Sequence, residues 1–261
     1  MKQNVIIGAT LLSLCFTSKA NAETEELHYE LTFQGQQVGE RVVSVRWLFT
    51  DDRDNRIITS WTDFSISVPL QSFSFQERMS GLGGMEPMGF TSSLSENGRL
   101  SQIQMVSSSL GWNVNHARDG VGWTTPLPES AIDATSMTLV DPGAAGFLDG
   151  HQTLRVLSAE SGTVISGTLE NLGEQTIAID GTVITSQSWV WHAGDGDVHL
   201  YYGEHGHLLK YTVDVYGQTL DATLLRAPSA RSYEDILGGT IDDSGEFTGS
   251  LIDVLVESEE L

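Results

Sequence analysis

Apolar and polar residues alternate along most of this chain from Leu27 onward. Leu27, Tyr29, Leu31 and Phe33 fall on one face of an extended strand, with polar residues between them. A period of two sends successive side chains to opposite faces, so it predicts half-buried β-strands. Such strands must pair into a sheet that buries one face, and this restricts the chain to an all-β fold. The same alternation marks the further segments Val42–Leu48, Ile57–Val68, Phe90–Leu94, Leu100–Val106, Thr176–Ile179 and Val183–Trp191.

Two-residue turn signals separate several of these segments. Asn97-Gly98 and Asp180-Gly181 each lie between two predicted strands, and Asp119-Gly120 and His205-Gly206 mark further turns. Such dipeptides tolerate the positive φ angles that tight hairpins require. Parallel strands would need long helical crossovers, for which the chain has no room. The strands are therefore predicted to pair antiparallel.

One segment interrupts the strand pattern. Residues 126–150 contain Pro126, Pro128 and Pro142, and the pattern predicts a short helix around Ala131–Val140. This segment either links two parts of the sheet or plugs one end of a barrel. The predicted fold is all-β and antiparallel, curled as a half-barrel or flattened barrel, with one short helical insertion.

The first 22 residues have the pattern of a secretory signal peptide. Lys2 gives a basic start, residues 5–16 are almost wholly apolar, and Ala20-Asn21-Ala22 forms an A-x-A cleavage site. The apolar run is shorter than the roughly 20 residues that a transmembrane helix needs. We expect cleavage after Ala22, export to the periplasm and no transmembrane segment in the mature chain.

Three parts of the chain follow from these patterns: a signal peptide over residues 1–22, a single antiparallel β domain over 23–230, and an acidic C-terminal tail over 231–261. From Ser232 the tail carries nine acidic residues and no basic ones. It is interpreted as a solvated terminus, or alternatively as a docking segment for a partner.

Charge and cysteine content exclude several classes of function. Loss of Lys2 and Lys19 with the signal peptide leaves 11 basic and 35 acidic residues, a net charge of −24. A field of that sign repels phosphate backbones and anionic lipid surfaces, so we expect no nucleic-acid partner. The one cysteine, Cys15, lies in the signal peptide, and the mature chain therefore has neither a disulfide nor a thiol nucleophile.

The histidines near the C-terminal end of the domain raise the question of a metal site. His192, His199, His205 and His207 lie close in sequence, with Asp195 and Asp197 among them. A two-residue turn at Glu204-His205 would place His199 opposite Lys210 and Tyr202 opposite His207. His199 and His207 would then point to opposite faces of the sheet. We therefore predict no metal site here.

No motif for nucleophilic catalysis is present in the mature chain. It contains no G-x-S-x-G elbow, no S-x-x-K and no H-E-x-x-H. The many acidic residues could supply a carboxylate pair for glycoside hydrolysis, but no pair is singled out by its position. We predict no catalytic residues and no cofactor.

A cluster of apolar residues is the strongest candidate for a binding site. It surrounds the glycine-rich stretch Gly81-Leu82-Gly83-Gly84, which is interpreted as part of a hairpin whose inner face fills the core, or alternatively as a lid. Methionine is flexible and adapts to varied apolar ligands. Two tryptophans that share one strand face are added to the candidate lining. The candidate residues are Phe73, Phe75, Met79, Met85, Met88, Phe90, Trp189 and Trp191.

Two patches resemble exported bacterial domains of unknown function. Tyr29–Gly35, followed by Val38-Gly39-Glu40, resembles their opening strand and the start of a long second strand. Residues 202–211 resemble their closing hairpin, and residues 73–105 fit their paired strands. Such domains are distantly similar to the periplasmic lipoprotein-carrier (Lol-type) half-barrels, in which an antiparallel sheet curls around an apolar cavity. The resemblance carries no catalytic residues.

These observations lead to a functional hypothesis and two alternatives. The chain is predicted to be a periplasmic, non-catalytic binding module for an apolar or amphipathic envelope ligand, such as a lipid or lipoprotein. The first alternative is a hydrolase acting on envelope polysaccharide or peptidoglycan through paired carboxylates. The second is an outer-membrane barrel, disfavoured by the absence of a final aromatic-ended strand. The sequence leaves the oligomeric state open.

Overall fold

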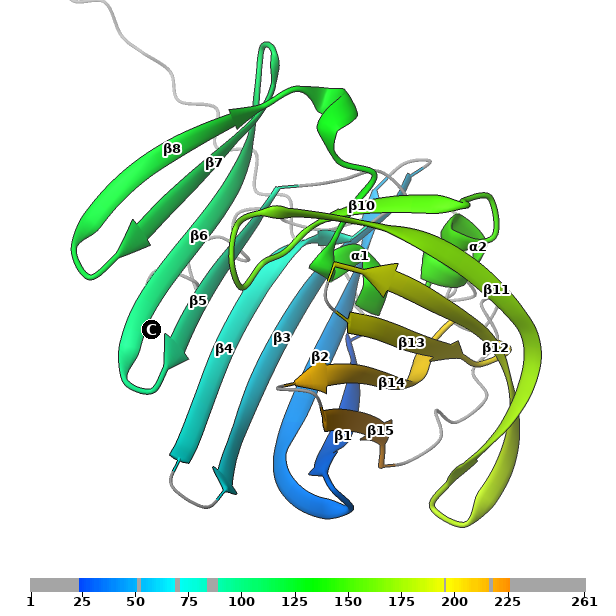
Figure 1. The fold of residues 1–261 in the computed structure, drawn as a ribbon. Coiled ribbons are helices and arrows are strands. Elements are labelled where there is room, and N and C mark those ends of the chain that lie inside the picture. Colours follow the sequence, from blue (N-terminus) through cyan, green and yellow to red (C-terminus); the bar gives the residue numbers. More distant parts are fainter. Residues whose placement is uncertain are drawn as a thin grey trace, which may run out of the picture. The chain divides into compact units, whose positions relative to one another are not determined.

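The described strands form one continuous sheet in the computed structural model (Figure 1). It has 15 strands in the order β8-β7-β6-β5-β4-β3-β2-β1-β15-β14-β13-β12-β11-β10-β9. The strands are β1 (Thr24–Phe33), β2 (Gln36–Thr50), β3 (Arg53–Val68), β4 (Gln71–Gly83), β5 (Phe90–Glu96), β6 (Arg99–Ser108), β7 (Gly111–Arg118), β8 (Val121–Leu127), β9 (Ala134–Thr135), β10 (Thr153–Leu157), β11 (Val164–Ile179), β12 (Thr182–Ala193), β13 (Gly196–Tyr202), β14 (Leu208–Val215) and β15 (Gln218–Leu224).

The structure describes residues 24–50, 53–68, 71–83, 89–194, 196–215 and 218–225. All of them fall within one compact unit, residues 22–237. The predicted signal peptide, the acidic tail, Met85 and Met88 lie outside the described residues.

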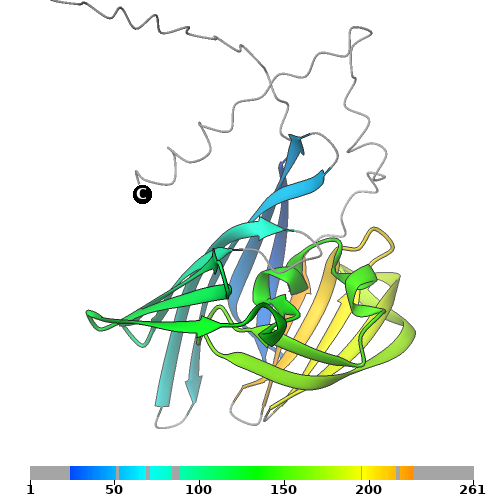
Figure 2. The same ribbon diagram turned by 90° about the horizontal axis from the view of Figure 1, so that it is seen from above.

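The sheet is nearly all antiparallel, and the predicted fold class is confirmed. Each strand from β1 to β8 pairs with its neighbour in sequence, as does each strand from β10 to β15. β1 also pairs with β15, which joins these two runs into one sheet. Within the described chain the one parallel pair is β9 with β10. The sheet curls but does not close, because β8 and β9 form its two edges (Figures 1 and 2).

The predicted hairpin turns have the expected backbone geometry. Asn97, Asp119 and Asp180 all have positive φ angles of 47–50°, and the glycine that follows each also has a positive φ. Two successive residues with φ above zero give a turn whose twist matches that of the flanking strands. The registers of β5 with β6, β7 with β8, and β11 with β12 follow from these turns.

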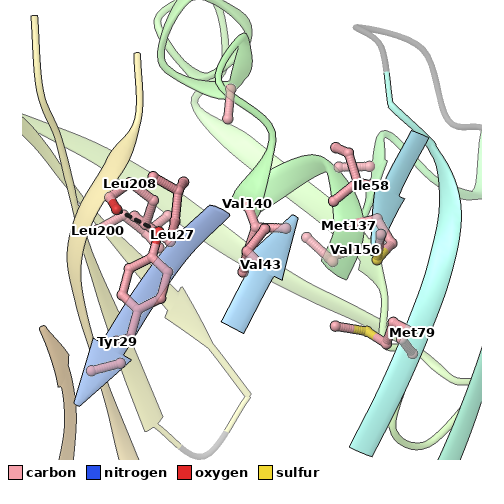
Figure 3. Close-up of a cluster of buried hydrophobic side chains, with 14 of the residues drawn as sticks. Leu27, Tyr29, Val43, Ile58, Met79, Met137, Val140, Val156, Leu200 and Leu208 are labelled. Carbon is pink, nitrogen blue, oxygen red and sulfur yellow. Dashed lines mark hydrogen bonds between the residues drawn. The ribbon is translucent and has the colours of Figure 1, made fainter. Parts of the chain in front are cut away.

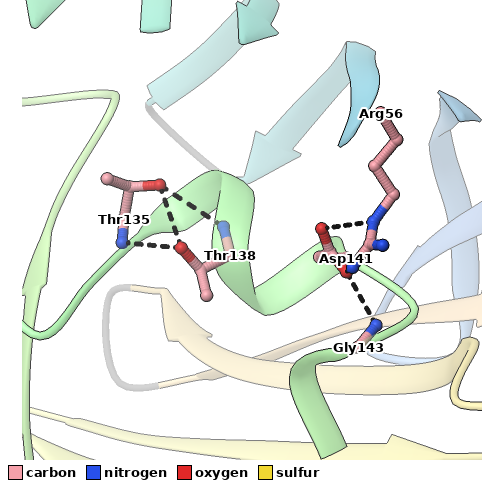
Figure 4. Close-up of polar contacts among 5 residues, drawn as sticks. All are labelled: Arg56, Thr135, Thr138, Asp141 and Gly143. Atoms are coloured by element: carbon pink, nitrogen blue, oxygen red, sulfur yellow. Dashed lines mark hydrogen bonds and ion pairs between the residues drawn. The ribbon is translucent and has the colours of Figure 1, made fainter. Parts of the chain in front are cut away.

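The predicted helical insertion between β8 and β10 contains more structure than one helix. It comprises the 3-10 turn η1 (Glu129–Ala131), β9 and two short helices, α1 (Ser136–Val140) and α2 (Ala144–Leu148). Thr135 caps α1, since its hydroxyl accepts a hydrogen bond from the Thr138 amide while the Thr138 hydroxyl accepts one from the Thr135 amide (Figure 4). None of the described helices is long and apolar enough to cross a membrane.

Helix α1 packs against the inner face of the curled sheet. Met137 and Val140 lie among Val43 of β2, Ile58 of β3 and Val156 of β10 (Figure 3). These side chains are all at most 4% exposed. Burial of each is worth roughly 1.5–3 kcal/mol, so the insertion is an integral part of the core.

Two tyrosines extend this core to the strands near β1. The Tyr29 hydroxyl donates to the carbonyl of Leu208 at 2.7 Å (Figure 3). The Tyr202 hydroxyl donates to the carbonyl of Leu139 in α1, also at 2.7 Å. Since both side chains are fully buried, these bonds satisfy hydroxyls that would otherwise be costly to bury.

A buried ion pair fixes the insertion to the sheet. Arg56 of β3 makes a bidentate contact with Asp141, which ends α1, and its Nε donates to Asp141 Oδ2 at 2.8 Å (Figure 4). The two side chains are 4% and 1% exposed. Asp141 also accepts the amide of Gly143 at 2.7 Å, and the Arg56 guanidinium lies 4.9 Å from the centre of the Trp47 ring. The ion pair therefore joins β3, α1 and the start of α2.

Asp141→Ala is expected to lower the free energy of unfolding by about 3–5 kcal/mol, because it leaves the Arg56 charge buried without this partner. Asp221→Ala provides a matched control, since Asp221 pairs with Lys210 at 3.0 Å where both side chains are about 30% exposed. The control should cost about 1 kcal/mol or less. Urea unfolding measures both values, and equal losses would contradict the role given to Asp141.

Candidate ligand-binding cavity

A cavity of about 650 Å³ lies on the inner face of the sheet. Strands from β1 to β8 and from β10 to β15 contribute to its wall, and α1 covers part of it through Ser136, Leu139 and Val140. Strands β2, β3 and β4 each have one end that packs against α1, here called the insertion end, and one end that faces the cavity, here called the cavity end. At the insertion end, residues such as Ile58 pack against α1; at the cavity end, Arg41 and Phe64 face the cavity.

The turn between β10 and β11 closes one side of the cavity. Ser158, Glu160 and Ser161 of this turn line it. The next residue, Gly162, has a φ of +66°, and a Cβ there would lie only 2.3 Å from the imidazole of His116 on β7. A residue with a side chain would therefore be both strained and in collision. The turn thus lies directly over the inner face of β7.

Aromatic rings form the apolar part of the cavity wall. Phe64 on β3 stacks with Phe75 on β4 at a ring-centre distance of 4.9 Å, and Phe73 lies 5.8 Å from Phe64. Phe64 and Phe75 are direct partners in the sheet register. Phe73 and Phe75 remain half-buried although they lie on the inner face, because they border the cavity.

A row of polar side chains lies beside these rings. In the sheet register Arg41 pairs with Thr62, and Thr62 pairs with Glu77, so the three share one face on successive strands. Arg41 Nε donates to Ser60 Oγ and Nη1 to the Tyr211 hydroxyl, both at 3.0 Å. Thr62 Oγ1 and Glu77 Oε1 are buried and have no hydrogen-bond partner among the described residues.

The environment of Glu77 shifts its ionisation strongly. Burial raises the pKa of Glu77 to about 8; nearby Glu160 adds to this rise and Arg41 opposes it. Partial desolvation in the cavity also raises the pKa of Glu160, which stays an exposed residue; Arg41 opposes this rise and Glu96 adds to it. At neutral pH Glu77 is thus largely protonated, and its carboxyl group can donate a hydrogen bond into the cavity.

The predicted site residues fall into three groups. Phe73, Phe75, Met79 and Trp191 line the cavity. Phe90 and Trp189 are 3% and 2% exposed and belong to the packed core. Met85 and Met88 lie outside the described residues. Gly81 and Gly83 continue strand β4 and do not form a loop; Gly84 is not among the described residues. That the lining residues bind a ligand stays a prediction.

The reason for the difference between these aromatics is their position along the strands. Phe90 pairs with Gly81, near the insertion end of β4, whereas Phe75 pairs with Glu96 at the cavity end. Trp189 packs edge-on against Tyr202 at 5.6 Å, and Tyr202 in turn bonds to α1. Both core aromatics therefore lie where packed side chains cover the inner face.

Sequence reasoning missed Arg41, Glu77 and Glu160. For two of them a signal is present. Arg41 has the same alternation phase as the buried Val43 and Val45, and Glu77 has the phase of Phe75 and Met79. A charged residue in the apolar phase of a strand indicates a polar group directed inward. Glu160 lies in a turn, where no such phase exists.

The histidines that are clustered in the sequence lie in different environments in the structure. His192 Nδ1 lies 2.8 Å from Asp197 Oδ1, and this hydrogen bond is the main cause of a raised pKa for the exposed His192 imidazole. His207 is buried and lies 2.8 Å from Glu25. The predicted register was wrong: His199 pairs with Thr212, because the turn spans residues 203–207 and a bulge follows Tyr201. Within the described ranges no group of three or more His, Cys, Asp or Glu residues could hold a metal ion.

Comparison with known proteins identifies the fold. The crystal structure of a beta-barrel-like protein of Domain of Unknown Function DUF1849, from Brucella abortus, aligns with a TM-score of 0.57. The alignment covers 78% of this chain and 95% of that chain at 10% sequence identity. No protein-family model and no curated protein sequence matches the chain. The likeness supports the predicted resemblance to bacterial β domains of unknown function; similarity to the Lol-type carriers stays a prediction.

Glu77→Gln is expected to flatten the pH dependence of stability. The pKa of Glu77 is about 8 in the folded chain against 4.5 for a free side chain. Between these values the folded state holds a proton that the unfolded state has released, so the free energy of unfolding falls as pH rises from about 4.5 to about 8. The variant lacks this proton, and its free energy of unfolding should fall less over the same interval.

The measurement is urea unfolding at pH 5 and at pH 8 for both proteins. Glu174→Gln serves as the control, because Glu174 is exposed on β11, and its profile should follow that of the unmodified protein. Parallel profiles for Glu77→Gln and the unmodified protein would show that Glu77 does not hold a proton in the folded state.

Proposed function

We propose that this chain is an exported, periplasmic protein that binds an apolar or amphipathic small molecule, of the lipid class, in the cavity of its curled sheet. The observation that carries the proposal is the cavity itself. Its volume of about 650 Å³ falls within the roughly 300–1,000 Å³ typical of small-molecule sites. The N-terminal pattern of residues 1–22 supports export, and the periplasm borders two membranes that supply such ligands.

The composition of the wall favours an apolar chain as the main part of the ligand. Phe73 and Phe75 present apolar surface to the cavity, and Met79 and Trp191 add to it. Apolar surface left in contact with water is unfavourable, and covering it by a ligand releases free energy of about 25 cal/mol per Å². Thr62 and Glu77 supply the few polar groups that orient a bound molecule.

One observation favours the hydrolase alternative. Glu77 and Glu160 interact in a cavity, as paired carboxylates do in glycosidases. Such enzymes, however, need environments that push the two pKa values apart, so that one group is an acid while the other is ionised. Both carboxyls have raised pKa values. The apolar wall beside them, formed by Phe64, Phe73 and Phe75, supports binding over hydrolysis.

Lipid capture tests the proposed function directly. The purified protein is incubated with an envelope lipid extract, separated from unbound lipid and analysed by mass spectrometry. We expect lipid to co-purify in a stoichiometric amount. The absence of any bound lipid, together with no binding of dodecanol or dodecanoate in calorimetry, would overturn the proposal.

Ser101→Trp should block the cavity. Ser101 is a half-buried residue of the inner face of β6 and lines the cavity wall. An indole at this position occupies the space of the ligand, so the dissociation constant for a bound dodecyl ligand should rise at least tenfold, about 1.4 kcal/mol. Gln104→Trp is the matched control, because Gln104 is exposed on the opposite face of the same strand. Equal affinities for the two variants would place the ligand outside the cavity.

A further inference from the structure

The guanidinium of Arg41 lies on the cavity wall and has no carboxylate partner in the described part of the chain. Among the described residues it has no acidic group within ion-pair distance, and both of its hydrogen bonds go to neutral hydroxyls, those of Ser60 and Tyr211. Arginine has five N–H donors, so three of them have no acceptor in the described part of the chain. The chain has 35 acidic residues, yet none of those that the structure describes forms an ion pair with this arginine.

The energetic cost of a guanidinium charge without an ion-pair partner favours a bound ligand that pairs with it. A charge removed from water is costly unless it is paired and hydrogen-bonded. Tyr211 offsets part of this cost, because the Arg41 guanidinium lies 5.5 Å from the centre of its ring. Glu77 acts on this charge only from beyond ion-pair distance, so no carboxylate among the described residues pairs with it directly. A ligand carboxylate would match the planar guanidinium with two parallel hydrogen bonds.

The neighbours of Arg41 complete a set of donors. Thr62 and Glu77 follow Arg41 on successive strands, and the buried oxygens Thr62 Oγ1 and Glu77 Oε1 have no partner among the described residues. Direct cross-strand neighbours lie about 5 Å apart, so one small head group can reach the Thr62 hydroxyl while it binds Arg41. Glu77, when protonated, adds a third donor to the same row.

The charge inside the cavity differs from that of the whole chain. Arg41, Arg99 and Arg118 line the cavity, which is three of the 13 basic residues, whereas Glu77, Glu96 and Glu160 are three of the 35 acidic ones. Two of these three carboxyls have raised pKa values. Arg99 and Arg118 are exposed, so they lie where the cavity meets solvent. The cavity is thus relatively positive within a strongly acidic protein.

We propose that the cavity selects anionic amphiphiles, specifically long-chain carboxylates, and that Arg41 binds the head group while the chain lies against the ring cluster of Phe64, Phe73 and Phe75. This inference rests on the proposed function, to which it adds the chemical class of the ligand. The polar row and the ring cluster are adjacent along the strands. Thr62 lies two residues from Phe64 on β3, and Arg41 lies two residues from Gly39, the β2 partner of Phe64.

A series of ligands with one tail and three head groups tests the proposal. Isothermal titration calorimetry at pH 7 compares dodecanoate, methyl dodecanoate and dodecyltrimethylammonium. With the unmodified protein we expect dodecanoate to bind at least tenfold more tightly than the ester, and the cation to bind most weakly. Equal affinities, or preference for the cation, would overturn the role of Arg41 and leave the proposed function intact. No binding by any of the three would overturn the proposed function as well.

Two variants assign the preference to Arg41. Arg41→Met should remove the difference between dodecanoate and the ester while the ester keeps its affinity, and Arg41→Lys should retain part of the preference. Arg46→Met is the matched control, because Arg46 lies on the same strand but on the opposite face, and it should behave as the unmodified protein. Thermal unfolding of each variant establishes that it is folded. A preference for dodecanoate that persists in folded Arg41→Met would contradict the assignment.

Discussion

The structure depends on the contact between the helical insertion and the concave face of the sheet. A curled sheet of this kind has an apolar inner face that its own strands leave partly uncovered, and Met137 and Val140 of α1 cover the insertion end of it. The buried Arg56–Asp141 ion pair holds α1 at that position. The cavity is the remaining part of the inner face, which the insertion does not fill.

Polar and apolar groups in the cavity are arranged in neighbouring rows. Arg41, Thr62 and Glu77 form one row across three strands, and Phe64 and Phe75 form the next. The two rows are two residues apart on each strand, which separates them by about 7 Å. A molecule with a polar head and an apolar tail fits this arrangement better than a wholly apolar or wholly polar one. The raised pKa of Glu77 reflects the enclosure of its carboxyl group by protein atoms.

Local patterns predicted the elements of this fold but not all of their contacts. The Asn97-Gly98 and Asp180-Gly181 turns and the strands around them were predicted correctly, since hairpin geometry depends on adjacent residues. Around His205 the predicted register was wrong, because a longer turn and a bulge shift the pairing of β13 with β14. The insertion was predicted to contain one helix, but it contains two. The second helix, α2, ends at the buried residue Leu148. Tertiary packing stabilises so short a helix, and the local sequence alone does not predict it.

The sequence by itself determined the all-β class, the antiparallel pairing and the face that each strand turns inward, because these follow from a period of two and from turn chemistry. It identified aromatic residues for the interior but did not separate Phe75, on the cavity wall, from Phe90, in the packed core. Only the tertiary structure decided this, since the outcome depends on where α1 and the β10–β11 turn lie against strands distant in sequence. The same long-range packing brings Arg41, Glu77 and Glu160 to one cavity, and no pattern within a single strand contains that information.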